Sequence, residues 1–152
     1  MEFNSLEYLL FLFFSIVVLR NCKNAKIFRI LLTLLSWFFY SFLNIKLLLL
    51  IVLFSVSCWI TSNLIYSRPK FKKRIVFFGI SIVLIQLMIF KYLGWLSQIW
   101  FDIYELDFTL KIILPIGISF YSFQAISYFI DLSKNRNVYV KDFWNLSAYL
   151  TF

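Results

Sequence analysis

The chain has 152 residues, of which 62% are apolar and only 14% are charged, against roughly 45–50% and about 25% in an ordinary soluble domain. A soluble fold of this length has one small core and would leave large apolar patches exposed to water. The formal net charge is +8, but the basic residues sit in gaps between apolar runs, which argues against a soluble nucleic-acid reader. The composition predicts a membrane protein. Its partner is expected to be the lipid bilayer and not a nucleic acid.

Apolar runs in chain order give the candidate membrane helices, since crossing about 30 Å of hydrocarbon takes close to 20 helical residues. The runs are Leu6–Leu19, Ile27–Leu43, Leu47–Tyr66, Ile75 to about Leu96, and Ile112–Ile130. The first is short enough to be an interfacial or re-entrant helix instead, and Phe143–Phe152 is typical of a helix cut short. The fold prediction is an all-α, polytopic transmembrane bundle of about five helices. Residues 1–152 are expected to form a single membrane domain, the amino-terminal part of a longer chain.

The charges in the gaps between these runs predict an orientation. Two gaps are strongly basic, and the basic residues are Arg20, Lys23, Lys26 and Arg29 in one and Arg68, Lys70, Lys72, Lys73 and Arg74 in the other. The gap at 102–111 is acidic instead, with Asp102, Glu105 and Asp107. Because Lys and Arg concentrate in cytoplasmic loops, the alternation places the amino terminus outside and the basic gaps in the cytoplasm.

The sequence lacks the residues that several kinds of catalytic chemistry require. Histidine is absent, and with it the usual general base at neutral pH and the commonest metal ligand. Cys22 and Cys58 are far apart, and the three glycines have no phosphate-loop spacing. We therefore expect no catalytic residue, no metal site and no bound cofactor within these residues.

Lys91 is a charged residue inside the fourth apolar run. Such a residue at membrane depth usually serves a partner or a pathway. One interpretation is that Lys91 snorkels toward the outer headgroups beside Tyr92 and Trp95. The other is that its ammonium lines a polar cavity.

The fifth run contains a helix break followed by a polar stripe. Pro115 removes a backbone donor and Gly117 permits unusual dihedral angles, so the start of this helix is expected to be kinked or broken. Beyond the break, one face carries Phe120, Gln124, Ser127 and Asp131, with Tyr121 and Tyr128 one heptad apart. Either these side chains make interhelical hydrogen bonds, or Gln124, Ser127 and Tyr128 line a substrate tunnel.

Parts of the sequence resemble a known family. The residues from Leu114 to Gln124, running on through Ile126–Tyr128 to Ile130 and Asp131, resemble the motif of the membrane-bound O-acyltransferase superfamily, in the branch of alginate O-acetylation and of D-alanyl transfer to teichoic acids. Met1–Phe11, Phe90–Tyr92, and Trp37–Tyr40 followed by Leu47–Leu50 resemble other parts of that branch. The family commonly follows its aspartate with Tyr-Arg, whereas Ser133 and Lys134 stand near Asp131 here.

The resemblance implies an activity that these residues do not complete. Family members move an acyl group, typically acetyl, from a cytoplasmic donor such as acetyl-CoA or an acyl carrier to hydroxyls of an extracytoplasmic polysaccharide. They do so in the bacterial cytoplasmic (inner) membrane, with periplasmic or carrier proteins as partners. Their intramembrane histidine is missing from this sequence, so the portion is expected to be inactive alone, with Lys91, Gln124, Ser127 and Tyr128 as tunnel residues.

Two other functions fit the residues. The chain could be a non-catalytic small membrane accessory or scaffold protein that keeps a helix bundle for partner binding. It could also be a transporter fragment, which only the broken fifth helix suggests. The two halves of the chain show no pseudo-symmetry that would favour a transporter.

Overall fold

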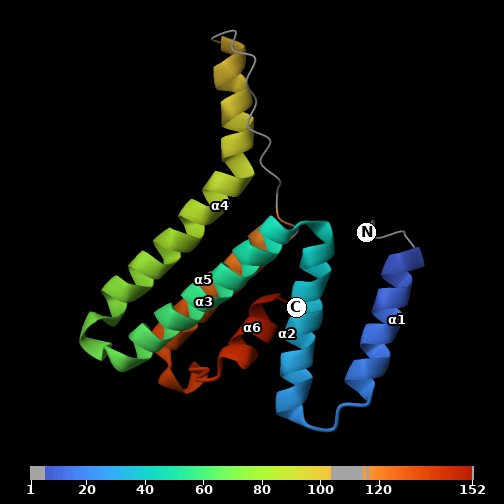
Figure 1. Cartoon of the computed structure of the whole chain (residues 1–152). Coiled ribbons are helices and arrows are strands. Elements are labelled where there is room, and N and C mark those ends of the chain that lie inside the picture. The colour runs from blue at the N-terminus through green and yellow to red at the C-terminus, as the bar shows by residue number, and fades with distance from the viewer. Residues whose placement is uncertain (1–5, 104–114, 116, 152) are drawn as a thin grey trace. The chain divides into compact units, whose positions relative to one another are not determined.

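The computed structural model describes residues 6–103, 115 and 117–151, and this part of the chain is helical without a strand. The helices are α1 (Leu6–Arg20), α2 (Ala25–Leu43), α3 (Ile45–Ser67), α4 (Lys72–Ile103), α5 (Ile118–Lys134) and α6 (Phe143–Thr151), with 3-10 turns η1 (Pro69–Phe71) and η2 (Arg136–Val138) (Figure 1). The chain divides into two compact units, Met1–Asn63 with Val140–Phe152, and Leu64–Tyr139. The predicted all-α fold class is confirmed.

Within the described residues, three helical segments are long and apolar enough to cross a membrane: Ala25–Phe42, Ile45–Ser67 and Pro69–Tyr92. Many of their large apolar side chains point outward, as Leu49 and Phe77 do with 63% and 68% of their surface exposed. Lipid tails solvate such faces, whereas water would not. The chain is an all-α membrane helix bundle. The number of crossings stays a prediction, because α1 and α5 are shorter than these three segments. The outside position of the amino terminus also stays a prediction.

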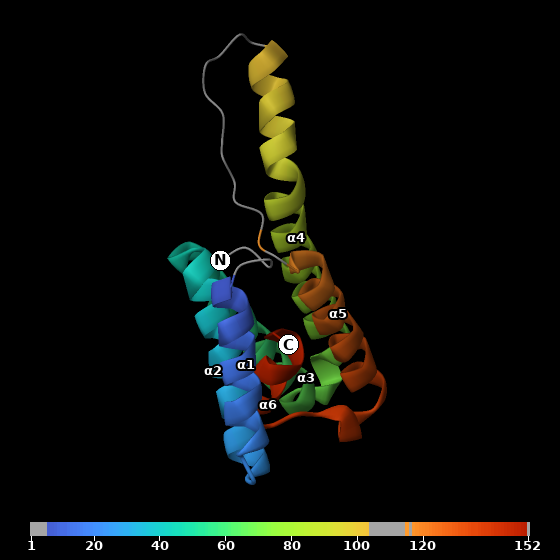
Figure 2. The same cartoon turned by 90° about the vertical axis from the view of Figure 1, so that its right-hand side faces the viewer.

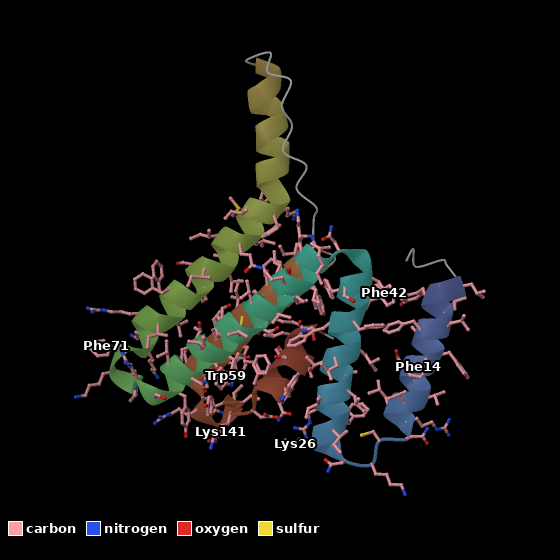
Figure 3. All side chains as sticks on the ribbon, viewed as in Figure 1. Phe14, Lys26, Phe42, Trp59, Phe71 and Lys141 are labelled. Atoms are coloured by element: carbon pink, nitrogen blue, oxygen red, sulfur yellow. The ribbon has the colours of Figure 1, made fainter. Side chains whose placement is uncertain are left out.

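Aromatic side chains pack the first unit, in which α1 and α6 both lie against α2 (Figure 1). The ring of Phe11 lies 5.9 Å from that of Phe38, linking α1 to α2. Trp37 of α2 and Trp144 of α6 are equally close at 5.9 Å. Trp59 Nε1 of α3 donates a hydrogen bond to the carbonyl of Lys141 at 3.1 Å, just before α6 (Figure 3). These contacts attach α6 to the unit although it is far from α2 and α3 in the sequence.

Asparagines cap several helix ends. Asn24 Oδ1 accepts from the Lys26 amide at 2.9 Å at the start of α2. Asn44 is the single residue between α2 and α3: its amide donates to the Tyr40 carbonyl at 3.1 Å, and its Oδ1 accepts from the Lys46 amide at 2.8 Å. Each cap satisfies backbone groups that a helix end leaves unpaired. Asn44 therefore ends one helix and begins the next within one residue.

The second unit is built on α4 and α5, which lie side by side (Figure 2). The buried face of α5 has helical spacing and consists of Ile118, Tyr121, Ser122, Ala125, Tyr128, Phe129 and Leu132. From α4, Val83 and Leu87 are buried as well. This spacing of buried residues three and four apart is the stripe by which a helix packs on its neighbour.

Two helix boundaries differ most from those predicted from hydropathy. The fifth helix was expected from Ile112, but α5 begins at Ile118, after Pro115 and Gly117; residues 112–114 and 116 lie outside the described part. Gly117 has φ 74° and ψ 9°, a left-handed conformation that does not continue a helix. The fourth was expected to end near Leu96, but α4 continues to Ile103, because a helix can extend beyond the apolar segment that hydropathy detects.

Substitutions at Gly117 should destabilise the fold in a graded way. A side chain with a Cβ costs roughly 1–2 kcal/mol in the left-handed region, and Asn tolerates that region better than Ala. We expect Gly117→Ala to lower the thermal unfolding temperature of the detergent-solubilised protein, and Gly117→Asn to lower it less. Equal unfolding temperatures for Gly117→Ala and the wild type would contradict the left-handed turn.

Candidate functional site

Hydroxyl groups in the apolar helices mostly bond to their own helix. Ser36, Ser55 and Thr61 donate to carbonyls one turn earlier, at 3.0, 2.8 and 2.8 Å. This local bond satisfies a hydroxyl without any partner from a neighbouring helix. Polar residues that lack such a bond therefore stand out as candidates for contacts with something else.

The buried polar atoms on α4 and α5 that have no hydrogen-bond partner among the described residues include Gln86 Nε2, Ser122 Oγ and Gln124 Oε1. The Ser122 side chain is fully buried. A buried polar atom without a partner costs roughly 1–3 kcal/mol. The α4–α5 pair therefore contains a donor, an acceptor and a hydroxyl whose hydrogen-bonding capacity no described residue fills.

The four residues predicted to line a tunnel take different positions on this pair. Tyr128 lies on the buried face of α5 and Gln124 is half-buried, whereas Ser127 is exposed. Lys91 is exposed near the end of the apolar segment of α4, with its ammonium 5.5 Å from the ring centre of Tyr92. Among the described residues, no hydrogen bond joins Lys91 to Gln124 or Ser127. The structure thus places Gln124 and Tyr128 one turn apart on α5 and leaves the tunnel role of all four a prediction.

The helix break lies at the start of the same helix. Pro115 is buried and stands outside α5, and its carbonyl accepts from the Ile118 amide at 3.3 Å. The Gly117 carbonyl accepts from the Tyr121 amide at 3.0 Å. Together these bonds set where α5 begins, and hence which of its residues face α4.

Gln86 and Ser122 were not among the residues predicted from the sequence. Gln86 is a lone amide within the apolar run of α4, and an uncharged polar residue in such a run is a signal that could have found it. Ser122 gives no such signal, because most serines in these helices donate to their own backbone. Only the bonding pattern in three dimensions distinguishes it.

A second group of unpaired polar atoms lies in the first unit, on α2 and α6. Its members among the described residues are Trp37 Nε1, Asn145 Oδ1 and Ser147 Oγ. Nearby, Thr33 Oγ1 donates to the Arg29 carbonyl at 2.9 Å and approaches the Trp144 carbonyl at 3.4 Å. This group belongs to the aromatic packing of α6 on α2.

Comparison with known proteins gives one informative match. The chain is 33% identical, over 122 residues that cover 76% of it, to a peptidoglycan O-acetyltransferase of Helicobacter pylori. The similarity supports an O-acyltransferase family. No family model matches the chain, and no solved structure matches it.

The match covers only part of the relative. The aligned region spans 23% of the Helicobacter pylori protein.

An O-acyltransferase must bring an acyl group and a hydroxyl together, and both are polar groups that need hydrogen-bonding partners inside an apolar bundle. The unpaired amide and hydroxyl groups of α4 and α5 have the donors and acceptors for such contacts.

Ser55 and Ser122 are both fully buried. Comparing their alanine variants tests whether the Ser122 hydroxyl lacks a hydrogen-bond partner. In Ser55 the hydroxyl donates to the Ile51 carbonyl at 2.8 Å, so Ser55→Ala should cost up to about 0.5–1.5 kcal/mol of stability. Ser122→Ala removes a hydroxyl without a partner and should leave the unfolding temperature unchanged or raise it. A loss for Ser122→Ala as large as that for Ser55→Ala would mean that the Ser122 hydroxyl is paired in the folded protein.

Proposed function

We propose that this chain is the amino-terminal transmembrane portion of an O-acetyltransferase. In this proposal the complete enzyme moves an acetyl group from a cytoplasmic donor, acetyl-CoA or an acyl carrier, to hydroxyls of an extracytoplasmic polysaccharide. The single observation that carries it is the identity of 33% to a peptidoglycan O-acetyltransferase across 76% of the chain. The resemblance of the Leu114–Gln124 segment to the membrane-bound O-acyltransferase motif supports the same class of enzyme.

The reaction chemistry indicates which steps these helices can and cannot perform. A sugar hydroxyl is a weak nucleophile and needs a positioned general base, most often histidine. The sequence contains no histidine, so we assign the base to residues outside these 152. The present helices then hold and orient the substrates, which lowers the entropic part of the barrier without supplying a proton acceptor.

The α4–α5 pair is the proposed wall of the substrate path. An amide such as that of Gln124 can accept from a sugar hydroxyl through Oε1 and donate to an acyl carbonyl through Nε2. The unpaired state of Gln124 Oε1, Ser122 Oγ and Gln86 Nε2 among the described residues supports this role. We extend it to Lys91, Ser127 and Tyr128, which lie on the same two helices.

The polysaccharide and the location form the finer part of the proposal. Peptidoglycan is the first acceptor to test, because the similar Helicobacter pylori protein is a peptidoglycan O-acetyltransferase. Alginate and teichoic acids, to which the family resemblance points, offer the same hydroxyl chemistry. The proposed location is the bacterial cytoplasmic membrane, crossed several times with the amino terminus outside. The alternation of strongly basic and acidic gaps along the sequence supports that orientation.

Deleting the gene tests the activity itself. We expect the O-acetyl content of the envelope polysaccharides, measured as acetate released by mild base from each purified fraction, to fall in one fraction and to return on complementation. Unchanged acetate in peptidoglycan and in every other polysaccharide fraction would contradict the acetyltransferase.

A substitution in the complete gene product tests the substrate path. We expect Gln124→Leu, which keeps the side-chain volume and removes the amide, to lower acetylation about tenfold, the equivalent of roughly one hydrogen bond of 1.4 kcal/mol. The matched control is Phe123→Leu, on the adjacent residue of α5 with 60% of its side chain exposed. Equal acetylation in both variants at equal protein level would remove Gln124 from the path but leave the function standing.

A further inference from the structure

One end of the second unit carries a dense group of cations. Six of them are exposed, and Arg136 is one of these. We call the other five the basic surface: Arg68, Lys70, Lys73, Arg74 and Lys134. Arg68 and Lys70 come from the connection between α3 and α4, Lys73 and Arg74 from the first turn of α4, and Lys134 is the last residue of α5. These two stretches are about sixty residues apart in the sequence.

Two hydrogen bonds bring the stretches together. Lys72 Nζ donates to the Ser133 carbonyl at 2.8 Å, and Arg136 Nη2 donates to the Tyr66 carbonyl at 2.7 Å. The Arg136 guanidinium also lies 4.6 Å from the ring centre of Tyr66, and the Tyr66 ring stacks on Tyr139 at 4.0 Å. Lys72 and Arg136 thus hold the two turns side by side, and the other cations stay available.

The charge of the basic surface is not balanced within the described residues. The side chains of its five members form no hydrogen bond or ion pair with those residues, and the nearest carboxylate in the sequence, on Asp131, forms no ion pair with them either. Burial raises the pKa of Tyr139 above its usual value, with Tyr128 and Tyr66 raising it further, so this phenol adds no negative charge at neutral pH. Crowded like charges repel one another, and anions nearby relieve the repulsion.

An exposed aromatic residue distinguishes this surface from an ordinary solvated one. Phe71, in the 3-10 turn η1 among the basic residues, has 53% of its surface exposed (Figure 3). The turn lies at the end of membrane-length segments of α3 and α4. Aromatic rings with cations around them are typical of the boundary between acyl chains and headgroups.

We propose that the basic surface binds the headgroups of anionic phospholipids in the surrounding bilayer. Arg68 and Arg74 can each form two parallel hydrogen bonds with phosphate oxygens, and Lys70, Lys73 and Lys134 act as point charges. Phe71 packs between the headgroups and the first acyl carbons. Clusters of four to eight Lys and Arg residues beside a membrane helix bind anionic lipid, with about a fivefold gain in affinity for each cation.

The test is lipid binding by the purified, detergent-solubilised protein, measured by native mass spectrometry during titration with phosphatidylglycerol or phosphatidylcholine. The wild type should bind phosphatidylglycerol at least tenfold more tightly, with the preference shrinking as salt rises. The variant Arg68→Gln/Lys70→Gln/Lys73→Gln/Arg74→Gln should lose at least tenfold in affinity for phosphatidylglycerol. Circular dichroism should show that it keeps the helical content of the wild type.

A second variant removes the same total charge elsewhere. Arg20→Gln/Lys23→Gln/Lys26→Gln/Lys46→Gln replaces four exposed cations of the first unit, and it should keep its affinity for phosphatidylglycerol within about threefold. Equal losses in both variants would show that net charge alone attracts the lipid and would overturn the proposal. So would a wild type that binds both lipids equally. If the first variant loses its helices, Lys134→Gln with Phe71→Ser replaces it, and unchanged binding by that variant would also overturn the proposal.

Discussion

The structure depends on one constraint: inside a bilayer no water is available to bond a free amide or carbonyl, so each segment must close its own backbone hydrogen bonds. Helices meet this condition along their length, and their ends are where it becomes difficult. Asn24, Asn44 and Asn135 supply side-chain oxygens at such ends, accepting from backbone amides at 2.8–3.0 Å. With the ends capped by single side chains, long helices can follow one another through very short connections, as α2 and α3 do.

The same constraint separates the polar side chains into two classes. Most serines and threonines bond to their own helix and leave the outer surface apolar toward lipid. Some buried polar atoms have no partner among the described residues, and those on Gln86, Ser122 and Gln124 are the ones that the proposed function uses. The account of an acetyltransferase portion therefore rests on what the α4–α5 pair leaves unpaired, together with the similarity to a peptidoglycan O-acetyltransferase. Catalysis itself is assigned elsewhere, because the 152 residues contain no histidine.

Sequence reasoning predicted the helices well and their ends less well. Hydropathy responds to long apolar runs, which is why α2 and α3 lie within a few residues of their predicted bounds. It does not respond to backbone conformation, so it extended the fifth apolar run back to Ile112, in a stretch that lies mostly outside the described residues. Pro115 and Gly117 were the signal for an interruption of that run, and α5 begins at Ile118 just after them. The extension of α4 to Ile103 was missed. The asparagine caps carry a readable signal, an Asn immediately before an apolar run. The unpaired Ser122 carries no such signal, since its sequence surroundings match those of serines that bond to their own helix. The hydrogen bonds from Lys72 and Arg136, which join two turns far apart in the sequence, carry no signal either.

The two natural cysteines test most directly whether the helix bundle is embedded in the membrane in the proposed orientation, with its basic gaps in the cytoplasm. Cys22 lies half-exposed in the basic gap between α1 and α2, and Cys58 is buried within α3; both are free thiols. The measurement is labelling with a membrane-impermeant maleimide in intact spheroplasts and in inverted membrane vesicles, with site-specific readout by mass spectrometry. The account predicts that Cys22 is labelled only in inverted vesicles and that Cys58 is labelled only after denaturation. Labelling of Cys22 in intact spheroplasts, or of Cys58 in the folded protein, would contradict it.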